Sequence, residues 1–285
     1  MDYQTHHGHA WWRVLFTSIV LYVAGLLILT LTENPNLFPA VVMLGNFMVP
    51  VTYVVFFYER SHLSDLTLPI TATSFIYGGL LGVFAAALLE PLLLHGLNLL
   101  AVFEIGLIEE FAKIFGVLVI ARRQRHHDEM DGLILGAAAG MGFAALESTG
   151  YAFTAFLSSG GSLSATVAVT LLRGLVSPMG HGTWTAILAG VLFRESPDGR
   201  VRVNRRVIEA YLVVAALHGL WDLLPSLLAA FAVSLTGILI GQAGVAAVGF
   251  ALLWKGWREA RARQASFQTT VTDRASSVTR GTGSA

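Results

Sequence analysis

The chain has 285 residues, of which 55% are hydrophobic and 13% are charged. In soluble domains about a quarter of the residues are charged. This chain therefore has too few charged residues to cover a water-exposed surface, and we expect it to be surrounded by lipid. The formal net charge of +0 leaves no basic excess to neutralise phosphates, which argues against a nucleic-acid partner. The absence of cysteine excludes disulfides, thiolate catalysis and cysteine-ligated zinc.

The hydrophobic residues fall into about eight stretches, each long enough to supply the ~20 apolar residues that cross a bilayer as a helix. The first stretch lacks the charged start and the cleavage site of a signal peptide, so we expect a retained helix. The fold class is therefore all-α, a polytopic membrane helix bundle. In chain order, the expected spans are residues 12–31, 37–58, 73–94, 97–121, 131–157, 165–193, 207–231 and 235–257.

The C-terminal segment differs in composition from the rest of the chain. From residue 259 the sequence becomes polar and rich in Ser and Thr, which is typical of disordered segments. We therefore expect a membrane-embedded domain over residues 1–258 and a disordered cytoplasmic tail over residues 259–285. Within the fifth span, Gly136, Gly140 and Gly142 would keep the helix slim and let its neighbours pack closely.

Basic residues indicate the orientation of the chain. They cluster after the fourth span (122–125), before the seventh (200–206) and after the eighth (255–263). With eight spans, all three clusters lie on one side, and the opposite loops ENPN, LLHGLN and SSGGSLS contain no Lys or Arg. Because cytoplasmic loops carry the excess of basic residues, both termini are expected in the cytoplasm.

Several ionisable side chains lie within the spans, where each costs at least ~2.5–3.5 kcal/mol unless it has a partner. Counted at 1.5 Å per residue, Glu109, Glu147, His181 and His218 lie ~16–24 Å from the cytoplasmic ends of four different helices. Carboxylates and imidazoles at one depth indicate a functional site. Arg173 and Glu104 are expected to pair with an opposite charge or a lipid headgroup instead.

Two spacings of four residues place polar side chains on a common helix face. Glu109 and Lys113 can neutralise one another in this way, and Asp222 can bond one imidazole nitrogen of His218 and so fix its tautomer. Taken singly, each pair is also compatible with a structural ion pair or a packing hydrogen bond.

Several protease motifs are absent from the sequence, and their absence limits the possible catalytic mechanisms. The sequence has neither the HExxH motif of zincins nor the GxGD motif of intramembrane aspartyl proteases. Ser177 and His218 would form a serine–histidine dyad, but no GxSxG elbow surrounds the serine. Carboxylate and imidazole chemistry remains, with Glu as the base for water and with His and carboxylates as metal ligands or oxyanion donors.

At this point the motifs resemble those of the PrsW family of intramembrane proteases, distant relatives of the CAAX prenyl proteases. EEFAK at 109–113 is similar to the family's EExxK motif, FAALE at 143–147 to FxxxE, and HGLWD at 218–222 to HxxxD. The segment HGTW at 181–184 resembles the family's further histidine helix. The CAAX proteases have arginine where this chain has Lys113 and histidine where it has Glu147. In both positions the chain therefore resembles the PrsW family more closely.

The resemblance implies an intramembrane endopeptidase of the bacterial cytoplasmic membrane that cuts single-span membrane proteins, such as an anti-sigma-factor-like protein. We expect Glu109 to be the water-activating base, Glu110 to assist or orient it, and Lys113 to keep the pair ionised.

The expected metal ligands are Glu147, His181 and His218. Asp222 would either hold one of these ligands in place by a hydrogen bond or act as a fourth ligand. The metal would be divalent, with zinc the first choice. Without a metal, His218 and Asp222 would polarise the scissile carbonyl.

Two other classes of membrane protein are compatible with part of this pattern of ionisable residues. Carboxylates and histidines at mid-membrane also relay protons in ion- or proton-coupled transporters, although no inverted repeat is visible. A non-catalytic membrane scaffold would keep the fold without the chemistry. Substrate cleavage, flux in proteoliposomes or neither would separate the three classes.

Overall fold

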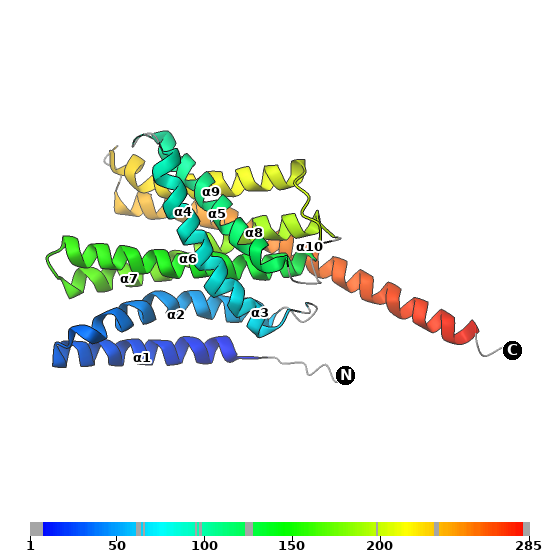
Figure 1. The fold of residues 1–285 in the computed structure, drawn as a ribbon, viewed down its shortest axis with the longest axis horizontal. Helices are drawn as coiled ribbons and strands as arrows, with labels where there is room; N and C mark the ends of the chain where they lie inside the picture. Colours follow the sequence, from blue (N-terminus) through cyan, green and yellow to red (C-terminus); the bar gives the residue numbers. More distant parts are fainter. Residues whose placement is uncertain are drawn as a thin grey trace.

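A computed structural model describes residues 8–60, 64, 66–94, 96, 99–122, 128–197, 199–230 and 234–281. Within these ranges all regular structure is helical, and Figure 1 shows the helices gathered into one bundle. The elements are α1 (Ala10–Thr32), η1 (Pro35–Leu37), α2 (Phe38–Glu59), α3 (Leu68–Thr73), η2 (Ser74–Gly78), α4 (Gly79–Leu93), α5 (Leu99–Ala121), α6 (Glu129–Ser158), α7 (Leu163–Val176), η3 (Ser177–Met179), α8 (His181–Arg194), α9 (Arg205–Ala230) and α10 (Leu235–Gly281).

Seven helical segments among the described residues are long and apolar enough to cross a membrane. The third is continuous from α3 through the π-helical turn η2 to α4, and the fifth joins α7, η3 and α8. Helix α5 has 23 residues and packs between α4 and α9, but it carries Glu104, Glu109, Glu110 and Lys113. The prediction of an all-α membrane bundle is confirmed.

Local sequence signals set the ends of the helices. The Asp128 side chain accepts a hydrogen bond from the Asp131 amide and caps α6. At the other end of this helix, Gly160 and Gly161 have positive φ, which glycine adopts without steric cost, and the turn they form leads to Ser162, which caps α7. Helix α1 begins, and α10 ends, at the opposite end of the bundle from this turn (Figure 1).

Helix α6 lies at the centre of the bundle, and every side chain from Glu129 to Ala145 is buried. Its glycines bring α8 into backbone contact. A Cβ atom on Gly136 would lie 2.4 Å from the carbonyl oxygen of Thr185, and one on Gly140 would lie 2.3 Å from that of His181. The expected close packing along the fifth span is confirmed, and this contact fixes the depth of His181.

The predicted span over 165–193 is not one continuous helix. Helix α7 ends at Val176, and α8 begins again at His181 after the short turn η3. Pro178 has no amide hydrogen to donate, and Gly180 has φ −116° and ψ −110°, outside the helical region. The Thr183 hydroxyl donates a hydrogen bond to the Pro178 carbonyl at 2.6 Å, which joins the first turn of α8 to η3. His181 is therefore the first residue of α8.

The C-terminal segment also differs from its expectation. Residues 259–281, for which the sequence predicts disorder, continue α10 as a helix, while residues 282–285 lie outside the described ranges. Figure 1 shows this part of α10 extending beyond the bundle. Glu259 pairs with Lys255 and Arg263 at spacings of four residues, and Arg263 also pairs with Glu129 of α6. Ion pairs at this spacing stabilise an exposed helix.

Candidate active site

Helix α5 carries three charged side chains into the bundle. The Nζ atom of Lys113 lies 3.1 Å from Oε2 of Glu109 and 2.9 Å from Oε1 of Glu110. Lys113 and Glu110 are fully buried, whereas the Glu109 side chain keeps 8% of its surface exposed. Spacings of three and four residues put all three groups on one face, so the ammonium neutralises charges that would otherwise be costly to bury. The predicted pairing of Glu109 with Lys113 is confirmed.

Helix α9 places His218 against both carboxylates of α5. Its Nδ1 atom lies 3.0 Å from Oε1 of Glu110, and its Nε2 atom lies 3.6 Å from Oε2 of Glu109. One turn further along α9, Oδ2 of Asp222 lies 3.3 Å from the same Nε2 atom. The predicted contact between His218 and Asp222 is present, and a buried carboxylate engages the other imidazole nitrogen.

The break before α8 places His181 beside this group. The Nδ1 atom of His181 lies 2.7 Å from Nζ of Lys113 and 3.8 Å from Oε2 of Glu109. Its Nε2 atom lies 3.3 Å from Oε2 of Glu147 on α6. The two imidazole rings are 5.1 Å apart at an interplanar angle of 80°. Four helices therefore bring their polar groups to one point, as their equal depth in the sequence predicts.

A second ion pair supports Glu147. Arg173 of α7 donates to Oε2 of Glu147 at 2.8 Å and to the hydroxyl of Ser148 at 3.3 Å. Its guanidinium group lies 3.9 Å from the ring centre of Tyr151. The expectation that Arg173 pairs with a carboxylate is confirmed. Tyr151 and Ser148 follow the FxxxE motif on α6, and the sequence analysis did not identify them, because neither belongs to a motif.

One acceptor atom in the cluster has no hydrogen bond. Oε2 of Glu109 is buried, and among the described residues no donor meets it with hydrogen-bond geometry. One atom each from Glu109, His181 and His218 lie within 4.8 Å of one another. One carboxylate and two imidazoles form a common ligand set for catalytic zinc, so the donors present are suited to a metal ion.

The predicted ligand set was Glu147, His181, His218 and Asp222. The structure brings both histidines together with Glu109, and Glu147 and Asp222 each lie 3.3 Å from an imidazole nitrogen.

A polar cavity of about 430 Å³ opens onto this cluster. Its lining includes Glu109, both histidines, Glu147, Asp222 and Arg173, but neither Glu110 nor Lys113. Of the two adjacent glutamates on α5, Glu109 is therefore the one that faces the cavity. Ser177 also lines it, but its hydroxyl donates to the Gly174 carbonyl at 2.8 Å. Gln242 of α10, which belongs to none of the motifs, also lines the cavity.

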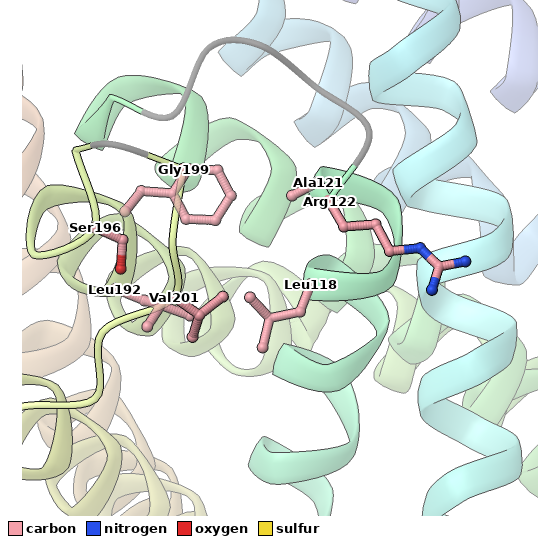
Figure 2. A pocket seen from close by; sticks show the side chains of 8 residues that line it. Leu118, Ala121, Arg122, Leu192, Ser196, Gly199 and Val201 are labelled. Carbon is pink, nitrogen blue, oxygen red and sulfur yellow. The ribbon is translucent and has the colours of Figure 1, made fainter.

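A smaller cavity lies apart from the cluster, between the end of α5 and the segment that follows α8. Its volume is about 100 Å³, and Leu118, Leu192 and Val201 meet across it (Figure 2). Arg122 borders this space, but its guanidinium group points away from it. No carboxylate or imidazole lines this cavity among the described residues, so it takes no part in the polar site.

Comparison with known proteins adds an independent finding. The family model described as PrsW family intramembrane metalloprotease matches residues 67–254, a range that contains every polar residue of the cluster and cavity. No curated protein and no solved structure matches the chain.

Proposed function

Because the chain belongs to the PrsW family of intramembrane metalloproteases, we propose that it hydrolyses peptide bonds of single-span membrane proteins at the cavity beside Glu109, His181 and His218. The substrates are membrane proteins within a lipid bilayer, and we propose that they include anti-sigma-factor-like proteins. The membrane is the bacterial cytoplasmic membrane, with both termini of the chain in the cytoplasm. The observation that carries the proposal is the buried Oε2 atom of Glu109, an acceptor without a hydrogen bond at the edge of a polar cavity.

Glu109 is the carboxylate that acts on water. Peptide hydrolysis needs a group that takes a proton from water as its oxygen attacks the carbonyl carbon, and that returns a proton to the leaving nitrogen as the C–N bond breaks. Glu109 is available for this transfer, since it lines the cavity and its Oε2 atom, an ion-pair partner of Lys113 at 3.1 Å, has no hydrogen bond of its own. Glu110 is engaged by both Lys113 and His218 and lies outside the cavity lining, so its role is to position its neighbours.

Carboxylates on the outer side of the cluster set the tautomers of both imidazoles. A proton on Nδ1 of His218 is donated to Glu110, which leaves Nε2 as a lone pair on the side of Glu109. A proton on Nε2 of His181 is donated to Glu147, which leaves Nδ1 as the acceptor near Glu109 and Lys113. Backing carboxylates of this kind orient histidine ligands and raise their basicity.

His181, His218 and Asp222 would hold the family's metal ion, which when bound would lower the pKa of water and polarise the peptide carbonyl, while Glu109 beside them stays free to act as the base. We propose zinc, because this ligand set is typical of catalytic zinc. The Lys113 ammonium already lies among the acceptor atoms of Glu109, Glu110 and His181, which indicates that the cluster stabilises positive charge. Glu147 orients the imidazole of His181 through its Nε2 atom.

The test is Glu109→Gln in full-length protein reconstituted with a single-span substrate. The amide keeps the volume of the side chain and removes its basicity, so we expect cleavage to fall by about 100-fold or more while expression and fold are kept. Glu104→Gln is the matched control, because Glu104 is an exposed glutamate of the same helix outside the cavity lining. Turnover near the wild-type rate in Glu109→Gln, or ion flux without cleavage in the wild type, would contradict the proposal.

A further inference from the structure

An apolar groove of about 860 Å³ lies on the membrane-facing side of the bundle, between α1, α2 and α10. Trp11 and Ile19 of α1, Val49 and Phe56 of α2, and Leu253 and Trp254 of α10 are among its walls. Arg60, at the end of α2, is the one charged residue among those that line it. The groove therefore suits an apolar occupant along nearly its whole length.

The groove and the catalytic cavity share a wall at the break between α7 and α8. Leu175 and Pro178 face the groove, whereas Ser177 and Gly180, from the same short segment, line the cavity. Helix α10 contributes to both spaces as well, since Gln242 lines the cavity and Leu253 lines the groove. The two spaces are thus neighbours that only a few residues separate.

The two spaces occupy opposite halves of the membrane. The groove is built from the first turns of α1 and the last turns of α2, which lie at the end of the bundle where α1 begins. The cavity extends the other way, because Val102 and Ile105 precede Glu109 on α5 while Tyr151 follows Glu147 on α6. One extended ligand can therefore lie in the groove up to mid-membrane and reach the polar cluster beyond it.

We infer that the groove binds one half of the substrate's transmembrane helix, the half nearest the termini of this chain. This inference rests on the proposed protease function and adds the surface on which the substrate docks. The helix packs its apolar side chains against α2 and α10 with hydrogen bonds intact, as a membrane-spanning segment requires. Beyond the break, its backbone meets the polar cavity, where water and polar side chains can satisfy peptide groups that unwind.

The first experiment detects the helix directly. Photoreactive p-benzoylphenylalanine replaces Val49 in full-length protein that also carries Glu109→Gln, in phospholipid vesicles with a labelled apolar single-span peptide. Val248 is the matched control position, because it is 51% exposed on α10 and is not part of the groove. We expect adducts with the peptide at position 49 and none at position 248. Adducts with phospholipid alone at position 49, or equal peptide adducts at both positions, would overturn the inference.

The second experiment measures the effect of the groove on turnover. Val49→Trp fills part of the groove without touching the polar cluster, so we expect KM for the peptide to rise about tenfold with kcat nearly unchanged. Val248→Trp should change neither constant, and an unchanged KM in Val49→Trp would contradict the docking surface. The crosslink is measured in an inactive variant, so a peptide adduct without cleavage by the wild type would preserve the groove and refute the protease function instead.

Discussion

Nδ1 of His218 and Nζ of Lys113 both contact one oxygen, Oε1 of Glu110, at 3.0 Å and 2.9 Å. Glu110 is fully buried and does not border the cavity. It therefore links α5 to α9 from behind the cluster. The adjacent Glu109 lies on the cavity side of the same turn, so two neighbouring carboxylates have separate tasks.

This division predicts different stability losses for the two glutamates. Glu110→Gln leaves a buried ammonium and imidazole with a weaker partner, and breaking a buried ion pair costs about 3–5 kcal/mol. Glu109→Gln should cost much less, since its carboxylate borders the cavity. Denaturant unfolding of both variants in detergent would measure the difference. Equal losses would show that Glu110 has no special structural role.

The proposed metal site predicts that His181→Ala and His218→Ala each lower the bound zinc per chain as well as the activity. A strong chelator should abolish cleavage, and added zinc should restore it. His9→Ala is the matched control, because His9 is an exposed histidine at the start of α1. Elemental analysis beside a cleavage assay provides both measurements.

One outcome would reject the metal. If activity survives chelation while His218→Ala is inactive, His218 and Asp222 instead stabilise the developing oxyanion in a glutamate-dependent reaction.

The glycines of α6 predict a stability difference within one helix. A Cβ atom on Gly142 would lie 1.9 Å from the Phe75 carbonyl oxygen. This oxygen belongs to the backbone, so it can move away only if the helix itself shifts. Gly142→Ala should therefore destabilise the protein by about 1–3 kcal/mol, the usual cost of overpacking. Gly150→Ala is the control, since nothing lies within 4 Å of its added methyl group. Equal melting temperatures for the two variants would contradict the close contact of α6 with η2.

The depth of the polar groups could be predicted from sequence because loops and basic clusters mark the helix ends, and residue counts then give positions along each axis. The same count does not give rotation about the axis. Glu109 and Glu110 are one residue apart, about 100° around the helix, and only the packing of α5 against α9 determines which of them faces the cavity. Pro178 and Gly180 did carry a local signal for the break before His181, but the apolar run through 165–193 masked it.

The helical extension of α10 was not predictable from composition. Its polar residues resemble those of a disordered segment, but the pair between Arg263 and Glu129 joins residues 134 positions apart. Contacts of this kind depend on the tertiary arrangement of α6 and α10.

The arrangement of the helices predicts the sides on which the loops lie. The turn at Gly160 lies at the end of the bundle opposite the start of α1, whereas the basic residues within 200–206 and 255–263 lie at the end where α1 begins (Figure 1). Reporter fusions at Gly160 should therefore report the outside, and fusions at Gly199 or after Arg263 the cytoplasm. A cytoplasmic signal from Gly160 would contradict the orientation and the count of eight spans.

The segment that joins α8 to α9 predicts a pH dependence. Asn204 donates to Oε2 of Glu195 at 2.7 Å, and Arg194 and Arg206 donate to Oε1 of the same carboxylate. These hydrogen bonds, the one from Asn204 foremost, hold the pKa of Glu195 below its usual range. Because the folded pKa is lowered, the stabilisation is complete above the ordinary glutamate pKa and is lost as the pH falls through the folded value.

Asn204→Ala separates this effect from a second role of the same side chain. The Asn204 carbonyl oxygen also accepts the Val207 amide at 3.2 Å, a capping bond at the start of α9 that does not depend on pH. We therefore expect Asn204→Ala to destabilise the protein more at about pH 7 than at a pH below the lowered pKa of Glu195, where the carboxylate is protonated. In a Glu195→Gln background only the loss of the cap should remain, equal at both pH values. Thermal unfolding of the four proteins measures this, and a pH-dependent effect that persists without Glu195 would assign the titration to another group.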